Sequence, residues 1–202
     1  MRVALTIGVL ALQGDFREHL ATLDACGVRT RAVKSAAQLS QCDALVLPGG
    51  ESTTIDKLAR AFDLRDPIVS AIAGGMPVYG SCAGMILLAD EVADGTADQQ
   101  TFGGIDMTVR RNAFGRQVDS FEEDLTIAGV AGPPLRAVFI RAPAVERVGS
   151  GVEVLATTSA EQSPDRIVAV RSGNLLATSF HPEVTGDHRI HELFIRIATK
   201  EQ

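Results

Sequence analysis

Apolar residues gather in short runs along the first half of the chain, and helical patterns separate these runs. Three runs, at residues 5–12, 43–47 and 76–80, have the length and near-continuous hydrophobicity of parallel strands that are buried on both faces. Residues 16–25 and 53–62 instead repeat their apolar positions at helical spacing. Strands that alternate with helices predict βαβ units, and therefore a mainly parallel sheet with helices on both faces.

The ends of these two helices carry local signals. Gly27 is expected to stop the first helix, since glycine readily adopts the left-handed conformation that ends helices. Thr53 and Asp56 have a spacing like a capping box, which predicts the start of the second helix.

The second half of the chain has the pattern of shorter strands with tight connections. Ser172-Gly173-Asn174 predicts a hairpin turn, and residues 187–198 place apolar side chains on one face of a final helix. Residues 91–104 form the most polar stretch and are expected to be a loop. The strands expected here lie at residues 136–140, 152–157, 166–171 and 174–180.

The length of 202 residues suits one α/β domain, residues 1–202, and a hydrophobic content of 46% suffices for a sizeable core. No stretch of about 18 uncharged apolar residues is present, so we expect no membrane span. The apolar run after Met1-Arg2 is broken by Gln13, Asp15 and Arg17 before any cleavage site of a signal peptide. We therefore expect a cytoplasmic protein.

The charge and aromatic content disfavour nucleic acid as a partner. The formal net charge is −6 and aromatic residues make up 4% of the chain, whereas nucleic-acid binders more often carry a basic stripe with exposed aromatics. The densest basic spots, at Arg29, Arg31 and Lys34 and at the pair Arg110-Arg111, are short and, as patches, are interpreted as solvated surface.

Three cysteines, an odd number without paired spacing, disfavour both a disulfide framework and a zinc site. Cys26 and Cys42 lie near apolar residues and are expected to be packing residues. Cys82 has a different setting.

Gly80-Ser81-Cys82-Ala83-Gly84 lies between an expected strand and an apolar helical stretch, the context of a nucleophile elbow. Such a turn strains the nucleophile's backbone, and the small flanking residues let strand and helix approach closely. The helix N-terminus favours thiolate, and the N–H of Ala83 is placed to donate to an oxyanion. A buried cysteine in an ordinary βα turn is the alternative.

A thiol nucleophile needs a base, and His181 ends the last apolar strand within His181-Pro182-Glu183. Pro182 fixes the backbone so that Glu183 can turn back towards the imidazole, set its tautomer and stabilise its charged form. Taken alone, this tripeptide is also typical of a strand-end turn. Surface roles are expected for the other three histidines, His19, His188 and His191.

Residues 47–52, Leu-Pro-Gly-Gly-Glu-Ser, also follow a strand and open a helix. The two glycines allow backbone N–H groups to turn towards a ligand. The segment lacks the lysine and the glycine spacing of nucleotide-binding loops, so an oxyanion hole is favoured over a phosphate site. A plain tight turn is the other interpretation.

With these segments in hand, the chain resembles the class I, triad-type glutamine amidotransferases over essentially its whole length. The elbow at residues 80–84 and His181-Pro182-Glu183 occur in many amidotransferases, whereas residues 11–14, 111–122 and 139–143 are characteristic of the pyridoxal 5′-phosphate synthase subfamily. The segments are residues 8–14, 47–54, 80–84, 111–122, 139–143 and 179–183.

The resemblance implies a three-layer, flavodoxin-like α/β fold with a mostly parallel central sheet, helices on both faces and a few antiparallel strands. It implies that Cys82, His181 and Glu183 hydrolyse L-glutamine to glutamate and ammonia, with Gly50 and Ala83 as the oxyanion hole. No metal or cofactor is implied. The residues that it assigns to glutamine binding are Gly50, Glu51, Ser52, Arg111, Ile140 and Arg141.

The resemblance also implies a partner, a synthase subunit that receives the ammonia to build pyridoxal phosphate, and Gln13 is expected near that interface. Three alternatives stay open: an amidotransferase subunit of another pathway, a cysteine hydrolase acting on esters or peptides, and a non-catalytic assembly subunit that keeps the fold. Without the family, a surface salt bridge would be the better interpretation of Arg111 or Arg141.

Overall fold

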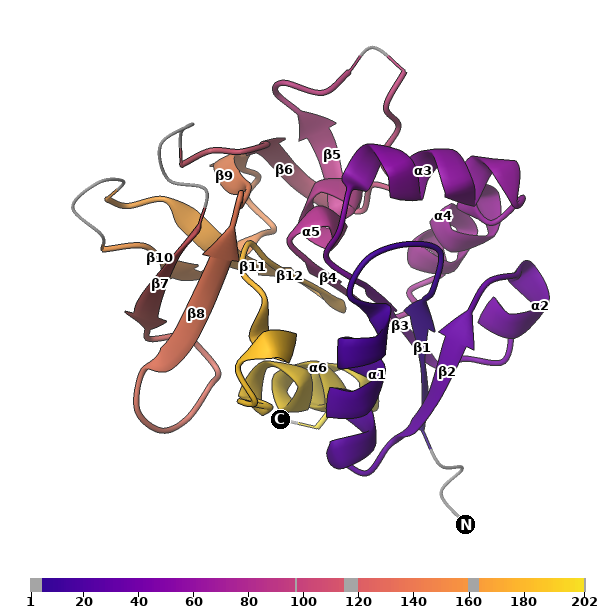
Figure 1. Ribbon diagram of the computed structural model, residues 1–202, viewed down its shortest axis with the longest axis horizontal. Helices are drawn as coiled ribbons and strands as arrows, with labels where there is room; N and C mark the ends of the chain where they lie inside the picture. The colour runs from indigo at the N-terminus through magenta and orange to yellow at the C-terminus, as the bar shows by residue number, and fades with distance from the viewer. Residues whose placement is uncertain (1–4, 97, 115–119, 160–163, 202) are drawn as a thin grey trace.

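The structure is a computed structural model that describes residues 5–96, 98–114, 120–159 and 164–201. A central sheet runs through the molecule, and within the described residues it contains ten strands (Figure 1). In spatial order they are β2 (Arg29–Val33), β1 (Thr6–Leu10), β3 (Ala44–Leu47), β4 (Val78–Ser81), β12 (Leu175–Thr178), β11 (Ile167–Ser172), β9 (Ala144–Val148), β6 (Ile105–Arg110) and β5 (Ala89–Val92), with β10 (Glu153–Thr157) paired to β11.

The first half of this order is parallel, as the alternation of strands and helices predicts. β2, β1, β3, β4 and β12 are all parallel to one another, and β5 pairs with β6 in parallel. Antiparallel pairs join β11 to β12, β10 and β9, and β9 to β6. The sheet is therefore mostly parallel at the end that carries the functional segments, with antiparallel strands beside it.

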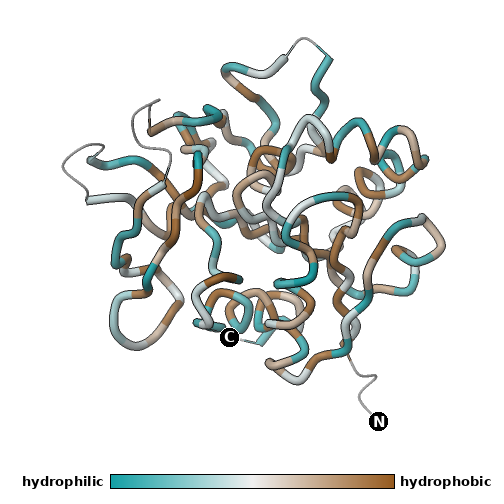
Figure 2. Tube along the Cα trace, in the orientation of Figure 1, coloured by the Kyte–Doolittle hydropathy of each residue, from teal (hydrophilic) through white to brown (hydrophobic). Residues whose placement is uncertain are grey.

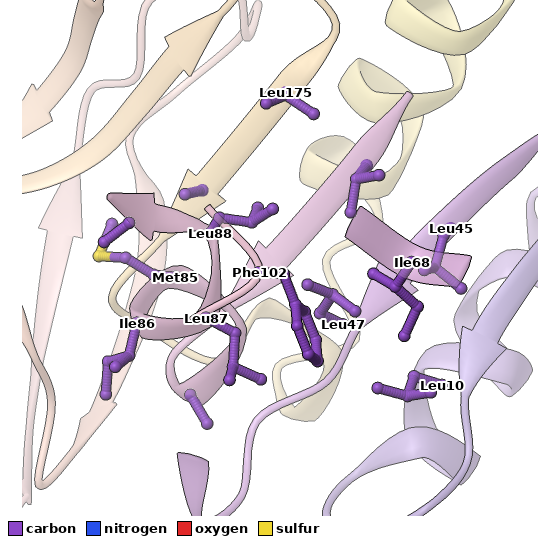
Figure 3. Close-up of a cluster of buried hydrophobic side chains, with 14 of the residues drawn as sticks. Leu10, Leu45, Leu47, Ile68, Met85, Ile86, Leu87, Leu88, Phe102 and Leu175 are labelled. Carbon is purple, nitrogen blue, oxygen red and sulfur yellow. The ribbon is translucent and has the colours of Figure 1, made fainter. Parts of the chain in front are cut away.

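Helices cover both faces of the sheet, which gives three layers. α1 (Phe16–Ala25) and α6 (Arg189–Thr199) share one apolar cluster, while α2 (Ala36–Leu39), α3 (Ser52–Ala61), α4 (Arg65–Ala73) and α5 (Ala83–Leu88) share the other. β3 divides its side chains between the two, because successive residues of a strand point to opposite faces. Leu45 and Leu47 enter the α5 side, drawn in Figure 3, and Ala44 and Val46 the α1 side.

A separate two-stranded sheet, β7 (Ser120–Leu125) and β8 (Leu135–Ile140), packs beside the main one. Aromatic contacts anchor it: the rings of Phe121 and Phe139 stack with centroids 4.4 Å apart, and Phe139 meets Phe180 edge-on at 5.7 Å. Since Phe180 precedes His181, this anchoring sets the end of β8 next to the segment that follows β12.

Several expected boundaries are confirmed. The first helix is α1 at the predicted residues, and Gly27 follows it with a φ of 79°. The hairpin at Gly173, with a φ of 56°, joins β11 to β12. α6 covers nearly all of the predicted last helix.

The capping box predicted at Thr53 is wrong. α3 begins one residue earlier, at Ser52, and its N-cap, Glu51, makes no side-chain capping bond. The Thr53 hydroxyl donates to Glu51 Oε1, and Asp56 accepts from Arg60 one turn later. Both side chains of the expected box are therefore used elsewhere.

The polar stretch of residues 91–104 begins in β5, and its described residues beyond Val92 form a loop that lies against α3. The backbone N–H of Gln100 donates to the buried carboxylate of Asp56, and Arg60 donates to the Asp98 carbonyl.

Hydrophobic and hydrophilic residues alternate along the helices, as expected of helices with one buried face (Figure 2). No helix in the described ranges is long and apolar enough to cross a membrane.

Candidate active site

The functional segments converge at the carboxyl ends of parallel strands. Thr178 of β12 pairs in register with Ser81 of β4, so the residues after these two strands are neighbours. The Cys82 N–H donates to the Thr178 carbonyl at 2.8 Å, which fixes the start of the turn. This is the edge at which open parallel sheets present their binding groups.

Cys82 stands on the strained turn that the sequence predicts, with φ 47° and ψ −100° between β4 and α5. The close approach depends on the flanking glycines. A Cβ on Gly84 would lie 2.2 Å from the carbonyl oxygen of Leu47, and one on Gly80 would lie 2.4 Å from the Gly84 backbone. Both contacts are with backbone, which cannot rotate away, so neither position has room for a side chain.

His181 and Glu183 form a buried pair next to this turn. His181 Nδ1 lies 2.7 Å from Glu183 Oε1, and Pro182 opens the 3₁₀ turn η1 (Pro182–Val184) that folds the carboxylate back onto the imidazole. Burial lowers the pKa of His181, but hydrogen bonds to Cys82 and Glu183 and the charges of both outweigh burial and raise the pKa to about 10. Burial raises the pKa of Glu183, and the bond to His181 offsets part of that rise.

Asp15, just after β1, is a residue of this site that sequence reasoning missed. Its Oδ2 lies 3.5 Å from His181 Nδ1, and burial raises the pKa of its carboxyl. Ligand atoms of Asp15, His181 and Glu183 lie within 4.8 Å of one another, a spacing at which three such groups could hold a metal ion. Nδ1 of His181 can serve either a metal or Glu183, not both.

A cavity of about 460 Å³ opens at Cys82 and His181. The oxyanion candidate Ala83 lines it. It is also lined by every residue that the resemblance assigns to glutamine: Gly50, Glu51, Ser52, Arg111, Ile140 and Arg141. The structure thus brings together residues from five segments that are far apart in the sequence.

The loop between β3 and α3 is packed tightly against the loop after β1. Gly50 has a φ of 147°, which only glycine adopts readily. The side chain of Gln13 accepts from the Glu51 N–H at 2.8 Å, and the Asp15 N–H donates to the Gly49 carbonyl. Gln13 also lines the cavity. Within the chain, the Gln13 side chain contacts the loop between β3 and α3.

Hydrogen bonds connect Glu51, Ser52 and Arg111 of the cavity lining, in part through Gln99. Arg111 donates to Glu51 Oε1 at 3.2 Å and to Gln99 Oε1 at 3.2 Å, and Gln99 donates to the Ser52 hydroxyl at 3.0 Å. Gln99 lies in the polar loop after β5. It was not predicted from the sequence as a site residue, because it belongs to no recognised motif. Within the segment 111–122, residues 115–119 lie outside the described residues.

The expected surface roles of two histidines are wrong. His19 and His191 are both fully buried, while His188 is partly exposed. α1 and α6 pack on the same face of the sheet, and each turns a histidine towards the other, so the two rings meet in the core. Cys42 is buried, Cys26 is half-buried, and all three cysteines are free.

The model of the SNO glutamine amidotransferase family matches residues 9–200. The chain belongs to this family. The structure agrees: a solved structure described as a glutamine amidotransferase superposes with a TM-score of 0.87 at 47% identity, covering 96% of this chain and 98% of that one. The fold predicted from the resemblance is therefore confirmed.

Curated relatives match along almost the entire length. The pyridoxal 5′-phosphate synthase subunit PdxT of Nocardia farcinica is 65% identical over 192 residues, which cover 95% of this chain and 85% of the relative. The subunit of the same name from Nocardioides sp. is 59% identical over 202 residues, which cover both chains completely. As a member of this family the chain is a glutamine amidotransferase, and the ester or peptide hydrolase alternative falls.

Proposed function

We propose that this chain hydrolyses L-glutamine with Cys82 as nucleophile, His181 as acid and base, and Glu183 as the residue that orients His181. The observation that carries the proposal is the meeting of the strained Cys82 turn and the buried His181–Glu183 pair at one cavity. Family membership supplies the reaction class, and the site supplies the residues that perform it.

The reaction starts when the Cys82 thiolate attacks the side-chain amide carbon of glutamine. The N–H groups of Gly50 and Ala83 stabilise the oxyanion, and His181 gives a proton to the departing ammonia. The glutamyl thioester remains on Cys82. His181 then takes a proton from water, which attacks the thioester, releases glutamate and restores the thiolate.

The raised pKa of His181, about 10, supports this starting state because it keeps an imidazolium next to the sulfur at neutral pH. Glu183 accepts from Nδ1 and leaves the other ring nitrogen for the sulfur and the leaving group. Asp15, 3.5 Å from the same Nδ1, adds a second carboxyl group on that side of the ring.

The ends of glutamine are zwitterionic, and the cavity offers both signs of charge. The guanidinium of Arg111 suits the α-carboxylate, and the carboxylate of Glu51 suits the α-ammonium group. We assign Ser52, Ile140 and Arg141 to the remaining wall of the same glutamine site.

The ammonia is delivered to a synthase subunit that builds pyridoxal 5′-phosphate. The names of the relatives support this step, since they describe subunits of a pyridoxal 5′-phosphate synthase at 59–65% identity. They also argue against a subunit of another pathway.

We further propose that residues 1–202 form one domain, because both apolar clusters share one sheet. A cytoplasmic location is consistent with three free cysteines.

An electrophilic glutamine analogue, a diazoketone, tests the site assignment. Incubation of the complex of this chain and its synthase subunit should place one label on Cys82, visible by peptide mass spectrometry, and excess glutamine should protect the thiol. Cys26 is the internal control, because it lies outside the cavity and should stay unlabelled. Labelling of Cys26 and Cys82 alike, without protection by glutamine, would refute the assignment.

The non-catalytic assembly subunit is the remaining alternative, and Cys82→Ala separates it from the proposal. The variant should lose hydrolysis and still bind the synthase subunit, measured by analytical ultracentrifugation. An unchanged rate of glutamate release in the variant would exclude Cys82 as the nucleophile.

A further inference from the structure

A buried polar chain lies behind the candidate triad. His19, in α1, is fully buried, with Nε2 2.9 Å from the Ser81 hydroxyl and Nδ1 2.9 Å from His191 Nε2. His191 and Ser81 are also fully buried. Ser81 directly precedes Cys82, so this chain reaches the nucleophile turn from the core.

The same ring of His19 faces the candidate acid. Its Nε2 lies 3.5 Å from Glu183 Oε2, and both side chains are completely inaccessible to solvent. Glu183 uses Oε1 for His181, and among the described residues no hydrogen bond satisfies Oε2. His19 Nε2 is therefore a polar neighbour of a carboxylate oxygen without a hydrogen bond in the described part of the chain.

Both core histidines are neutral at physiological pH. Burial, followed by the nearby His191 and His181, holds the pKa of His19 well below its usual value. Burial, followed by the charge of His188, lowers the pKa of His191 to about 4. Each ring therefore carries one proton, and two arrangements of the chain need comparison.

In the first arrangement His191 Nε2–H donates to His19 Nδ1, and His19 Nε2–H points at Ser81 and Glu183. The buried His191 Nδ1, which has no hydrogen-bond partner within the described ranges, is then only an unused acceptor. In the second arrangement a lone pair of His19 faces the Glu183 carboxylate, and His191 Nδ1–H is a buried donor without an acceptor. A buried unpaired donor is costly and the lone pair repels the carboxylate, so the first arrangement is preferred.

We propose that His19 is a positioning residue of the glutaminase site. Its Nε2–H tautomer, which His191 fixes, holds the second oxygen of Glu183. The first oxygen of Glu183 therefore stays ionised and aimed at His181. This rests on the proposed role of the Cys82–His181–Glu183 triad. Burial favours the neutral form of the Glu183 carboxyl, and an N–H directed at Oε2 opposes that tendency.

In the part of the chain that the structure describes, few other titratable groups face His19. The ring of Tyr79, in β4, meets His19 edge-on at a centroid distance of 6.0 Å, and its hydroxyl contacts Thr178. Burial, followed by the Glu183 charge, holds the pKa of Tyr79 well above its usual value, so Tyr79 is neutral. On the η1 side the facing groups are Glu183 and His181, and on the α6 side His191. A proton on His19 Nε2 therefore faces the negative charge of the Glu183 carboxylate.

The test compares two variants of His19, a fallback variant of His191 and a matched control. His19→Leu removes the N–H, while the amide of His19→Gln can place an N–H near the position of Nε2. The first readout is the NMR titration of the His181 imidazole in the chain alone, which needs neither glutamine nor a partner. His19→Leu should lower the titration midpoint of His181 from about 10 towards its ordinary value, and His19→Gln should restore it.

The second readout is glutamate release by each variant in complex with the synthase subunit. His19→Leu should lower kcat by about tenfold or more with little change in KM, since the N–H that faces the Glu183 carboxylate is lost. His188→Gln, which alters a histidine outside the chain of contacts, should retain wild-type kcat. Wild-type inactivity would refute the proposed function itself, whereas the His181 titration judges the role of His19 without any turnover.

An unchanged His181 midpoint in folded His19→Leu, or an equal loss of kcat in His19→Leu and His19→Gln, would mean that His19 only fills space and would overturn the proposal. Thermal unfolding monitors the fold of each variant. If His19→Leu does not fold, His191→Phe removes the donor that sets the tautomer while keeping an aromatic ring. It should lower the same His181 midpoint, and an unaltered midpoint there would equally contradict the proposal.

Discussion

Gly49 offers a perturbation of the site whose size follows from the structure. A Cβ on Gly49 would lie 2.4 Å from His181 Cε1 and 2.9 Å from its Nδ1. Gly49 does not have a left-handed φ, so alanine fits the backbone and the effect of Gly49→Ala is steric. The added methyl group acts on the imidazole directly.

The displacement can be estimated from the contact. Ordinary van der Waals contact begins at 3.4 Å, and 3.4 − 2.4 gives about 1 Å by which the ring or the loop must move. A misplacement of about 1 Å in a catalytic group costs on the order of 100-fold in rate. Overpacking of this kind costs about 1–3 kcal/mol of stability, which corresponds to a fall in Tm of roughly 2–12 °C for a chain of this size.

Steady-state glutamate release in the presence of the synthase subunit, together with differential scanning calorimetry, measures both effects. Gly151→Ala is the matched control, because a Cβ there meets nothing within 4 Å and should change neither rate nor Tm. Wild-type kcat in a folded Gly49→Ala variant would refute the reasoning, since it would mean that the position of His181 against this loop is not the one used in catalysis.

Three further predictions address the turn, the base and the cavity. Gly84→Ala should lower the free energy of unfolding by about 3 kcal/mol or more in urea titrations, because its Cβ would meet the Leu47 carbonyl at 2.2 Å; a change under ~0.5 kcal/mol would contradict the tight elbow. In Cys82→Ala the His181 midpoint, about 10 in the wild type, should fall in an NMR titration. Because the pKa of His181 is raised in the folded state, the stability that its protonation contributes is present below the ordinary pKa of histidine and is lost as pH rises through about 10. The free energies of unfolding of wild type and Cys82→Ala should therefore converge at alkaline pH. A difference between the two free energies that does not change with pH would contradict this. Arg111→Ala should raise KM for glutamine by roughly 10- to 100-fold through loss of a charged contact, whereas an unaltered KM would remove Arg111 from the glutamine site.

The fold could be predicted where the chain is apolar on both faces. β1, β3 and β4 stand out as hydrophobic runs because helices cover them on both sides. β2 escaped notice because it is an edge strand whose sequence, Arg-Thr-Arg-Ala-Val, keeps charged side chains at the border of the sheet. β7 was missed for a similar reason, since Ser-Phe-Glu-Glu-Asp-Leu exposes its acidic residues.

The candidate site could be predicted where the chemistry is local in sequence. Cys82 lies in a nucleophile elbow and His181 has Glu183 two residues away, so each motif can be recognised in a short stretch of sequence. Asp15 and the pair His19–His191 carry no such motif: their partners lie on other strands and helices, up to 172 residues away, and only packing brings them together. Histidine is also a poor guide to exposure, because a ring that finds two partners can be buried as neutral imidazole.

The central claim is that the thiol of Cys82 hydrolyses glutamine. The most direct measurement is glutamate release from glutamine by the chain together with its synthase subunit, for the wild type and for Cys82→Ala, with the fold of both verified by thermal unfolding. The account predicts release that the wild type sustains and that Cys82→Ala abolishes. Sustained release by folded Cys82→Ala, or none from the folded, reduced wild type, would contradict it.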